Sequence, residues 1–456
     1  MKLVDYLVDD YRKTGSVGSG IPLQPALDED TFRIVRRRLL QTTVRKAYSN
    51  TAFYSRIAKS MNIDARGDFR LESLPVTRKE DLRGKERDFI DAESKGPILS
   101  FSSTSTTGFP PTRVWMGRRE MELLAATNAF NLISNARLLP DDILLSAVSS
   151  RATLSNWVTV EACKRIGASM IHTGTIDPDE CLRYLSTDYG IRGKRKKPTR
   201  LTTYPSYLEV LCDTAKKNGY AESDFALKSI YLVGEVLTSC AVDRSRELFN
   251  ADVSESYNIS ECIQMRGGVC PNGNLHFAAN GEVEVLHPES LEPVSDGGLG
   301  VLTFTPYSPP REVTLLVRYA TGDVDRKVGE CRCGLQNTSV VSRPLGKRSQ
   351  LLASSGLTYR DLFELLEEVE GVSHPLRVGC QRGAGGELVV HVAVEANYYH
   401  RASEDILNRL AKNGVAAVVV THGRTDSFEH YPLRSELIEP ALSAIRAMRE
   451  AVVSAM

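Results

Sequence analysis

The chain has 456 residues, of which 57 are lysine or arginine and 57 are aspartate or glutamate. This length exceeds one ordinary hydrophobic core, so at least two domains are expected. The balanced charge gives no overall attraction to nucleic acid or to an anionic membrane, so neither is an expected partner.

The N-terminal segment carries acids among its apolar residues, which is not the pattern of a secretory signal. No run of apolar residues is long enough to cross a membrane. The nine cysteines are scattered irregularly, a distribution typical of reduced thiols and not of a disulfide framework. Together these features predict a cytoplasmic protein.

Residues 29–60 place apolar side chains at helical spacing, which predicts an N-terminal amphipathic helix. An apolar strand at 98–101 then runs into the segment 101–112, FSSTSTTGFPPT, which is crowded with hydroxyl side chains. Such a segment cannot bury a core, and its backbone and hydroxyl donors suit an anion such as phosphate. A solvated loop is the alternative, because the segment has a single glycine, Gly108, and no lysine follows it.

Helical and strand patterns alternate over the next half of the chain. This alternation predicts parallel strands crossed by helices, an α/β layer architecture. The predicted helices are 118–135, 158–167, 206–217 and 239–249, and the predicted strands are 142–148, 168–172, 201–204, 227–233 and 253–257.

After residue 281 the pattern changes to short alternating strands, 282–286 and 300–305, which predict a β-rich subdomain. A hinge is expected near Gly346. Beyond it, helices at 359–369 and 402–412 and strands at 387–394 and 415–420 predict a compact α+β domain. The expected division is therefore an N-terminal domain, 1–345, whose β-rich part is about 270–345, and a C-terminal domain, 346–456.

Three further segments follow the hydroxyl loop in order: Gly234-Glu235, the run YNISE at 257–261, and the run RYATGD at 318–323. With the loop they resemble, in order and spacing, the adenylate-forming enzymes, in the branch of phenylacetate-CoA ligases and coenzyme F390 synthetases. The resemblance runs from about residue 30 to about residue 350. It implies a large multi-layer α/β domain with a β-rich subdomain, followed by a small mobile α+β domain.

The resemblance also implies roles for individual residues. Glu261 would ligate Mg²⁺, a hard cation that prefers oxygen ligands, and Asp323 would accept hydrogen bonds from the ribose hydroxyls. Tyr257 would flank the adenine. The alternatives are a helix-cap acid for Glu261 and a β-turn acid for Asp323. The remaining residues of the implied ATP or AMP site are Ser103, Thr104, Ser105, Thr106, Thr107 and Gly108 around the phosphates, with Gly234, Glu235, Asn258 and Ser260.

A second group of residues has the chemistry of a metal site. Cys270 and His276, with Cys331 and Cys333, would give the three thiolates and one imidazole of a closed tetrahedral site, which is typical of structural Zn²⁺. The Cys-x-Cys spacing is tighter than the common two-residue gap. Some relatives in the resembled branch carry a Cys/His zinc site here, and the alternative is four unmetallated side chains.

The sequence departs from the resembled family at three places. Ser105 stands where glycine is usual, and Phe109 where lysine is frequent. The hinge motif has Lys347 in place of arginine, which supplies the positive charge without the planar fork. The family's catalytic lysine near the C-terminus is missing, and Arg434 is the nearest substitute cation.

These patterns predict a ligase that activates a carboxylic acid with ATP and Mg²⁺ and passes the acyl group to a thiol or an amine. Coenzyme A is the default acceptor, while a carrier-protein thiol and an amine remain open, as does a homodimer. The expected acid is small and aromatic or apolar, in a pocket formed by Trp157, Tyr204, Tyr207 and Ile259. The competing hypothesis is a nucleotide- or acyl-binding relative that has lost adenylation with the missing lysine. Zinc-scaffolded nucleic-acid binding is a distant third.

Overall fold

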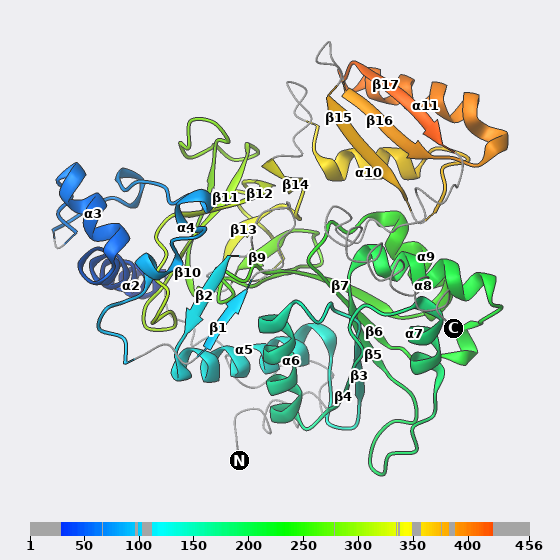
Figure 1. The fold of residues 1–456 in the computed structure, drawn as a ribbon, viewed down its shortest axis with the longest axis horizontal. Helices are drawn as coiled ribbons and strands as arrows, with labels where there is room; N and C mark the ends of the chain where they lie inside the picture. The colour runs from blue at the N-terminus through cyan, green and yellow to red at the C-terminus, as the bar shows by residue number, and fades with distance from the viewer. Residues whose placement is uncertain are drawn as a thin grey trace, which may run out of the picture.

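The computed structural model describes residues 29–422 except 66, 96–98, 103–111, 278, 334, 336–337, 349–356, 375 and 383–387. Two predicted site elements therefore lie outside the described residues: the hydroxyl loop from Ser103 to Gly108, and Arg434. The fold is mixed α/β, as predicted, with one large sheet and three smaller ones (Figure 1).

The predicted helix at 29–60 is two helices, α2 (Glu29–Asn50) and α3 (Ala52–Met61). Thr51 separates them because its backbone is extended and its side chain accepts a hydrogen bond from the backbone N–H of Tyr54, which caps α3. The chain continues through η1 (Leu71–Ser73), α4 (Lys79–Leu82) and η2 (Glu86–Phe89) to the antiparallel hairpin β1 (Leu99–Ser102) and β2 (Arg113–Met116).

The large sheet has eight strands in the order β13-β9-β8-β7-β6-β5-β3-β4. The five strands from β4 to β7 are parallel to one another, and β8, β9 and β13 extend the sheet in antiparallel fashion. The bounds are β3 (Ile143–Ser146), β4 (Ser169–His172), β5 (Arg200–Thr203), β6 (Ser229–Val233), β7 (Asp252–Tyr257), β8 (Gly267–Val269), β9 (Leu275–Phe277) and β13 (Ser339–Val341).

Helices cover both faces of the parallel part of this sheet (Figure 1). One face carries α5 (Arg118–Ala136) and α6 (Thr153–Ile166), and the other carries α7 (Pro178–Ser186), α8 (Pro205–Lys217) and α9 (Ser239–Phe249). Side chains alternate between the faces along each strand: Tyr231 of β6 packs with α5 and α6, whereas Ile230 and Leu232 pack with α7, α8 and α9. Continuous apolar strands in the sequence therefore correspond to strands that are buried on both faces.

The second sheet is antiparallel, with the order β10-β11-β12-β14. Its strands are β10 (Gly281–Leu286), β11 (Leu299–Pro306), β12 (Tyr319–Arg326) and β14 (Gly346–Lys347). Its inner face shares an aromatic core with the large sheet, in which Phe277 of β9 packs edge-on against both Tyr257 of β7 and Phe304 of β11. This shared core joins the two sheets beside the carboxyl end of β7.

The C-terminal part has a core of its own, formed by α10 (Tyr359–Glu367), η6 (Ala396–Tyr398) and α11 (Tyr399–Lys412) on a three-stranded sheet. The strands are β15 (Val378–Arg382), β16 (Leu388–Ala393) and β17 (Ala417–His422). The two helices and β16 lie close to their predicted positions, and β15 was not predicted. The division of the chain at residue 346 stays a prediction.

Helix α10 contacts the N-terminus of α9 through two acids. Thr238, the N-cap of α9, donates a hydrogen bond to Glu367 Oε1 at 2.8 Å, and the backbone N–H of Ser239 lies 3.3 Å from both carboxylate oxygens of Glu364. Free N–H groups and the helix dipole favour negative charge at this position. Burial, with the neighbouring Glu209 carboxyl, nevertheless raises the pKa of Glu367 to about 8.

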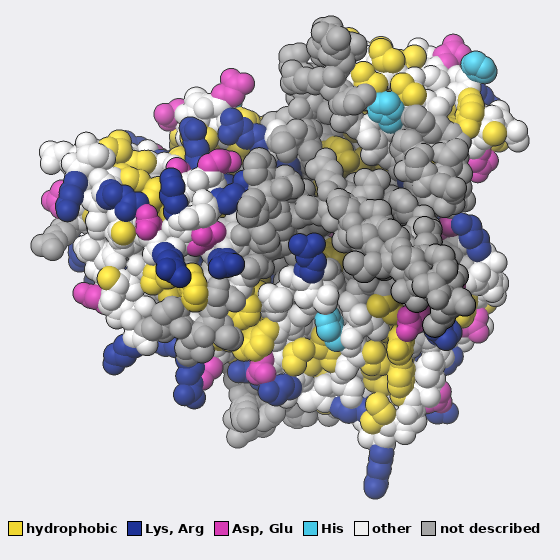
Figure 2. Space-filling model, in the orientation of Figure 1, with side chains coloured by type: hydrophobic (Ala, Val, Ile, Leu, Met, Phe, Trp, Pro, Cys, Tyr) yellow, Lys and Arg dark blue, Asp and Glu magenta, His cyan; other side chains and the backbone are white. Residues whose placement is uncertain are grey.

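Within the described residues, no helix is both long and apolar enough to span a bilayer. The visible face of the molecule intersperses basic and acidic side chains around α3 and α4 (Figure 2). This mixture around α3 and α4 agrees with the balanced composition of the chain.

We expect Glu367→Gln to stabilise the protein at alkaline pH. The pKa of Glu367 is raised from 4.5 to about 8 in the folded chain, so its contribution to stability is complete below pH 4.5 and is lost as the pH rises through 8. Glutamine mimics the neutral acid and should raise Tm by a few degrees at pH 8.5 and leave it nearly unchanged at pH 5.

The measurement is thermal unfolding between pH 5 and pH 9, with Glu404→Gln as the control because Glu404 is exposed on α11. An equal effect of Glu367→Gln at both pH values would contradict the assignment of a raised pKa to this acid.

Candidate active site

Asp323 on β12 lies at the meeting point of the two sheets. The phenol of Tyr257, at the end of β7, donates a hydrogen bond to Asp323 Oδ2 at 2.7 Å, and Lys347 Nζ on β14 lies 3.0 Å from Asp323 Oδ1. Burial alone would raise the pKa of Asp323, but the Lys347 charge and the Tyr257 hydrogen bond outweigh it, so this pKa lies below 3.8. Three of the residues predicted for the site are therefore in direct contact, around an ionised carboxylate.

Glu261 follows β7 and is 4% exposed. Its carboxylate forms an ion pair with Lys79 of α4 at 3.7 Å, and Oε1 has no hydrogen-bond partner in the part of the chain that the structure describes. The charge of Lys79 also lowers the pKa of Asp323, which places this cation near both acids. Lys79 was missed by the sequence reasoning, because a single lysine in a short helix carries no pattern.

The backbone around Glu261 is held by Arg311, whose side chain is fully buried. Its guanidinium donates to the carbonyl of Glu261 at 3.2 Å, to Thr314 O at 2.5 Å and to the Gln264 side chain at 3.3 Å. Five donors in a planar fork allow one side chain to bind several segments at once. Like Lys79, Arg311 was missed by the sequence reasoning. Its contacts are to backbone carbonyls and to Gln264, so it holds the segment that carries Glu261 in position.

Gly234 and Glu235 follow β6 at the carboxyl edge of the sheet. Gly234 has a φ of +83°, which only glycine adopts without strain. Glu235 Oε2 accepts hydrogen bonds from the backbone N–H and the hydroxyl of Ser206, at 3.1 and 2.6 Å, and so satisfies the N-terminus of α8. The predicted pair therefore shapes the turn at the end of β6.

A cavity opens at the carboxyl ends of β3, β5 and β6, between the sheet and the helices α5 and α6. Its volume is about 30 Å³, room for a water-sized group. Asn258 lines it and belongs to the same segment as Tyr257 and Glu261, so the cavity adjoins the acids described above. Openings at the carboxyl edge of a parallel sheet are the usual place for ligands.

The four residues predicted for an apolar acyl pocket do not meet in one place. Tyr204 and Tyr207 belong to the core beside α8, where the Tyr207 hydroxyl donates to the carbonyl of Ile176. Ile259 packs against the core shared by the two sheets, and Trp157 packs against Phe101. None of the four lines the cavity, whose wall combines polar side chains with Leu132, Val148 and Val233. Their role in acid binding stays a prediction.

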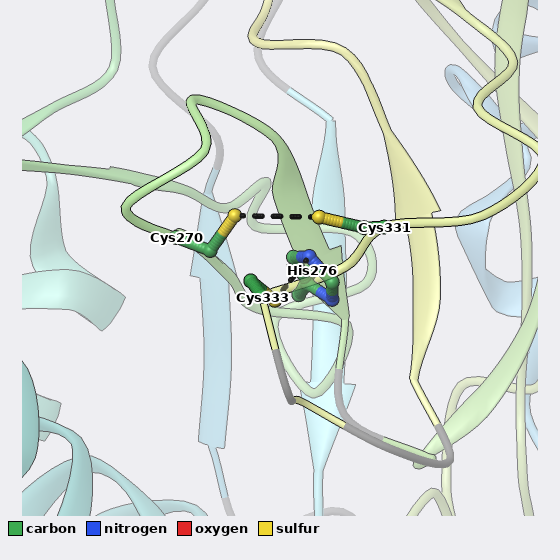
Figure 3. Close-up of side chains that lie close together, drawn as sticks. All are labelled: Cys270, His276, Cys331 and Cys333. Atoms are coloured by element: carbon green, nitrogen blue, oxygen red, sulfur yellow. Dashed lines mark hydrogen bonds between the residues drawn. The ribbon is translucent and has the colours of Figure 1, made fainter.

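The Cys/His group converges from two segments (Figure 3). The ligand atoms of Cys270, His276, Cys331 and Cys333 all lie within 4.8 Å of one another. The sulfur atoms of Cys270 and Cys331 are 3.7 Å apart, and Cys333 Sγ is 3.4 Å from His276 Nε2. A sulfur separation of 3.7 Å is far too long for a disulfide.

These distances fit a metal ion. Zn–S bonds of about 2.3 Å in a tetrahedron place two sulfur atoms about 3.8 Å apart. His276 Nδ1 lies 2.8 Å from the Thr338 hydroxyl, a partner that would orient the ring, and the hydrogen bond from Asn274 contributes to lowering the pKa of Cys331 to about 6. The side chains predicted as ligands are therefore adjacent, and a tetrahedral cation suits their spacing.

Comparison with known proteins gives the following likenesses. No protein-family model matches the chain. The chain is 24% identical over 405 residues to a phenylacetate-coenzyme A ligase of Thermus thermophilus. The aligned region covers 85% of this chain and 87% of that protein. Two solved structures share the fold: 2-hydroxyisobutyryl-CoA ligase in the postadenylation state with 2-HIB-AMP (TM-score 0.72, 19% identity, 88% of each chain), and ATP-bound MatB from Rhodopseudomonas palustris (TM-score 0.53, 16% identity, 73% of this chain and 65% of that one).

The order of the sequence motifs, the two joined sheets and these similarities all indicate the same fold. The resemblance predicted from the sequence is confirmed: over most of its length the chain is similar to a phenylacetate-CoA ligase, and it has the fold of the adenylate-forming CoA ligases.

Proposed function

We propose that this protein activates a small carboxylic acid with ATP and transfers the acyl group to coenzyme A. In the first step a carboxylate oxygen attacks the α-phosphorus, the bond to pyrophosphate breaks, and an acyl adenylate forms. In the second step a thiol sulfur attacks the acyl carbonyl, the thiol proton is lost, and AMP leaves. The observation that carries the proposal is the contact of Tyr257, Asp323 and Lys347 beside Glu261, in a chain similar to a phenylacetate-CoA ligase.

Asp323 is the residue proposed for the ribose hydroxyls. Its carboxylate is ionised and is oriented by Tyr257 and Lys347, so it accepts hydrogen bonds without reorganisation. Tyr257 would flank the adenine, with Gly234, Glu235, Asn258 and Ser260 in the same pocket. The loop from Ser103 to Gly108 would hold the phosphates.

Glu261 is the residue proposed to bind Mg²⁺. Its buried Oε1 has no hydrogen-bond partner within the described residues, and a carboxylate oxygen of this kind suits a hard cation. When bound, Mg²⁺ would neutralise charge on the phosphates as pyrophosphate leaves. Lys79 now forms an ion pair with this carboxylate, so a bound cation would displace or share that contact.

Positive charge at the transferring phosphoryl group would come from residues other than the family's missing lysine. Lys347 binds Asp323, which makes it a positioning residue for the ribose site. Arg434 remains the proposed substitute for the lysine. Lys79 is a further candidate, because its charge lies near both Glu261 and Asp323.

The proposal extends to the C-terminal unit and to the acyl acceptor. The C-terminal unit, 346–456, is proposed to move as a small domain about a hinge near Gly346. Coenzyme A is the preferred acceptor because of the likeness to a CoA ligase, while a carrier-protein thiol, an amine acceptor, a homodimer and a cytoplasmic location stay predictions.

Cys270, His276, Cys331 and Cys333 are proposed to bind one structural Zn²⁺. Two observations support this zinc site. The distances between the sulfur and imidazole nitrogen atoms fit a tetrahedron, and the Thr338 hydroxyl lies within hydrogen-bond distance of His276 Nδ1. The ion would join the turn between β8 and β9 to the segment before β13 and stabilise both by closing the intervening loop.

Adenylation is tested by exchange of labelled pyrophosphate into ATP across a panel of acids. We expect exchange with at least one acid, and a decrease of about 100-fold for Glu261→Gln, because the variant removes a carboxylate ligand from the Mg²⁺ that would neutralise the reacting phosphates. Glu247→Gln is the matched control, since Glu247 is an exposed acid on α9.

Two outcomes would contradict the adenylation proposal. The role of Glu261 fails if its glutamine variant exchanges like the parent chain. ATP and Mg²⁺ that protect the protein thermally without exchange for any acid would favour a nucleotide-binding relative that has lost adenylation. Lys79→Met and Arg434→Met, measured alongside, show which cation replaces the missing lysine.

Metal analysis of the purified chain should find about one zinc per molecule, and Cys331→Ser should reduce it. Chelation should lower Tm by several degrees, because the metal links two segments that are distant in sequence. Cys240→Ser is the control, since Cys240 lies outside the cluster. A chain that holds no zinc and keeps its Tm in chelator would refute the zinc site.

A further inference from the structure

Helix α10 of the C-terminal unit contacts α9 of the large domain (Figure 1). Within the described residues, no buried hydrophobic cluster contains side chains of both: the unit has a core of its own, and α8 and α9 pack on the large sheet. The hydrogen bonds across the boundary use charged side chains, namely Glu364, Glu367 and Arg360 of α10 and Glu209 of α8. Such a contact depends on the charge state of its groups more than on apolar burial.

Two carboxyl groups face this boundary from opposite sides, Glu367 on α10 and Glu209 on α8. Glu367 Oε1 accepts a hydrogen bond from the Thr238 hydroxyl, whereas its Oε2 is buried and has no hydrogen-bond partner among the described residues. Glu209 is also buried, and its Oε2 lies 3.4 Å from the backbone nitrogen of Leu376 and 3.6 Å from Arg244 Nη1. One cation at this distance does not compensate two buried negative charges.

The surroundings of the pair hold further acids. Glu364 of α10 lies at the first N–H group of α9, and the other titratable groups nearby are Glu235 after β6, Asp213 and Lys216 on α8, Cys240 and Asp243 on α9, and His374 before β15. The start of α9 favours negative charge, but burial prevails. Burial, with Glu235 nearby, raises the pKa of Glu209 to about 7, and burial, with Glu209 nearby, raises the pKa of Glu367 to about 8.

We infer that these two carboxyl groups control the position of the C-terminal unit: it is docked on α8 and α9 while Glu209 and Glu367 are protonated, and it is released when both ionise. The inference rests on the mobility of this unit, which is part of the proposed function, and adds what controls it. In the released unit both carboxyl groups would be in water, where their pKa is near 4.5. Their contribution to docking is therefore complete below pH 4.5 and is lost as the pH rises through 7 and 8.

His374 has the opposite effect and limits the pH range of a test. Burial and the charges of Arg244 and Lys216 lower its pKa from 6.5 to about 4 in the docked unit. Protonation of His374 therefore opposes docking below pH 6.5, where the two acids favour it. Above pH 6.5 the imidazole is largely neutral in both positions of the unit, so the acids alone determine how docking changes with pH.

Arg360 makes a second contact across the boundary, and this contact does not titrate. Its guanidinium donates to the carbonyl of Pro344 at 2.8 Å and to the carbonyl of Leu237, and lies 3.5 Å from Glu255 Oε1. A guanidinium keeps its charge at any physiological pH. The unit is therefore held by one contact that depends on pH and one that does not, so variants at the two contacts should behave differently.

Hydrogen–deuterium exchange of the full-length chain, measured by mass spectrometry between pH 6.5 and pH 8.5 and corrected for the intrinsic rate, tests the inference. The backbone N–H groups of Ser239 and Leu376 face acids across the boundary, so their peptides report docking. We expect their corrected exchange to rise about 10- to 100-fold over this interval, because both acids ionise in it. Glu367→Gln should reduce the rise to about 4-fold, since only Glu209 then titrates.

Two further variants separate the acids from the rest of the contact. Arg360→Gln should speed the exchange at both pH values and keep the rise with pH. Glu404→Gln is the matched control, because Glu404 is exposed on α11, and it should behave as the parent chain. Peptides from β5 and β6 and the thermal unfolding of each variant show whether faster exchange reflects unfolding of the whole chain.

The outcomes distinguish this inference from the proposed function. An equal rise in the parent chain and in Glu367→Gln would overturn the inference. Fast exchange in Arg360→Gln, with no change with pH in the parent chain, would also overturn it and keep a mobile C-terminal unit. Exchange that changes with neither pH nor any variant would refute both the control by the acids and the mobility. Adenylation is decided separately by pyrophosphate exchange.

Discussion

The hydrogen-bonded carboxylate of Asp323 joins the two sheets on which the candidate active site is built. Tyr257 ends a strand of the large sheet, whereas Asp323 and Lys347 are opposite residues on adjacent strands of the smaller one. A buried carboxylate is costly unless it is paired and hydrogen-bonded. Here the compensation comes from both sheets, so loss of either partner would leave a charge poorly satisfied in the interior. The link therefore holds the sheets together and keeps a charged acceptor ready for a ligand.

Arg311 holds the segment that follows β7 in place, as the Asp323 carboxylate holds the two sheets together. This segment runs in irregular backbone, so its carbonyl groups need partners outside any sheet ladder. The fully buried guanidinium binds the carbonyls of Glu261 and Thr314, and its charge is balanced by Glu120 of α5 at 3.8 Å. The carboxylate proposed to bind Mg²⁺ therefore lies on backbone that Arg311 holds in place, outside any helix or strand.

The sequence was informative where a pattern is local or repeated. The alternation of helices and strands predicted the parallel sheet, and the motif order predicted that Tyr257, Glu261 and Asp323 belong together. The break at Thr51 was missed because one apolar periodicity spans both α2 and α3, and the break depends on a single capping hydroxyl.

Other features depend on contacts between distant residues and leave no local signal. Lys79 and Glu261 are 182 positions apart, and only the folded chain brings them to 3.7 Å. The acyl pocket predicted from the sequence was not found as one group of residues, for a different reason. Tyr204 directly follows β5 and Tyr207 lies in the first turn of α8; at such positions an aromatic side chain that packs in a core and one that lines a pocket look the same in the sequence.

The Cys/His cluster and Tyr257 of the candidate active site are linked by a single strand, β9. His276 and Phe277 are consecutive on β9, so their side chains point to opposite faces of the sheet. His276 faces the three cysteines, and Phe277 packs edge-on against Tyr257, with ring centroids 5.8 Å apart. Gly267 lies opposite Phe277 on β8, and a Cβ there would come within 2.9 Å of the Phe277 ring and 2.8 Å of Leu275. Glycine at this position leaves room for the Phe277 ring and the Leu275 side chain. The Cys/His cluster and the aromatic neighbour of Tyr257 therefore share one strand, so a change at the cluster has a physical route to the candidate active site.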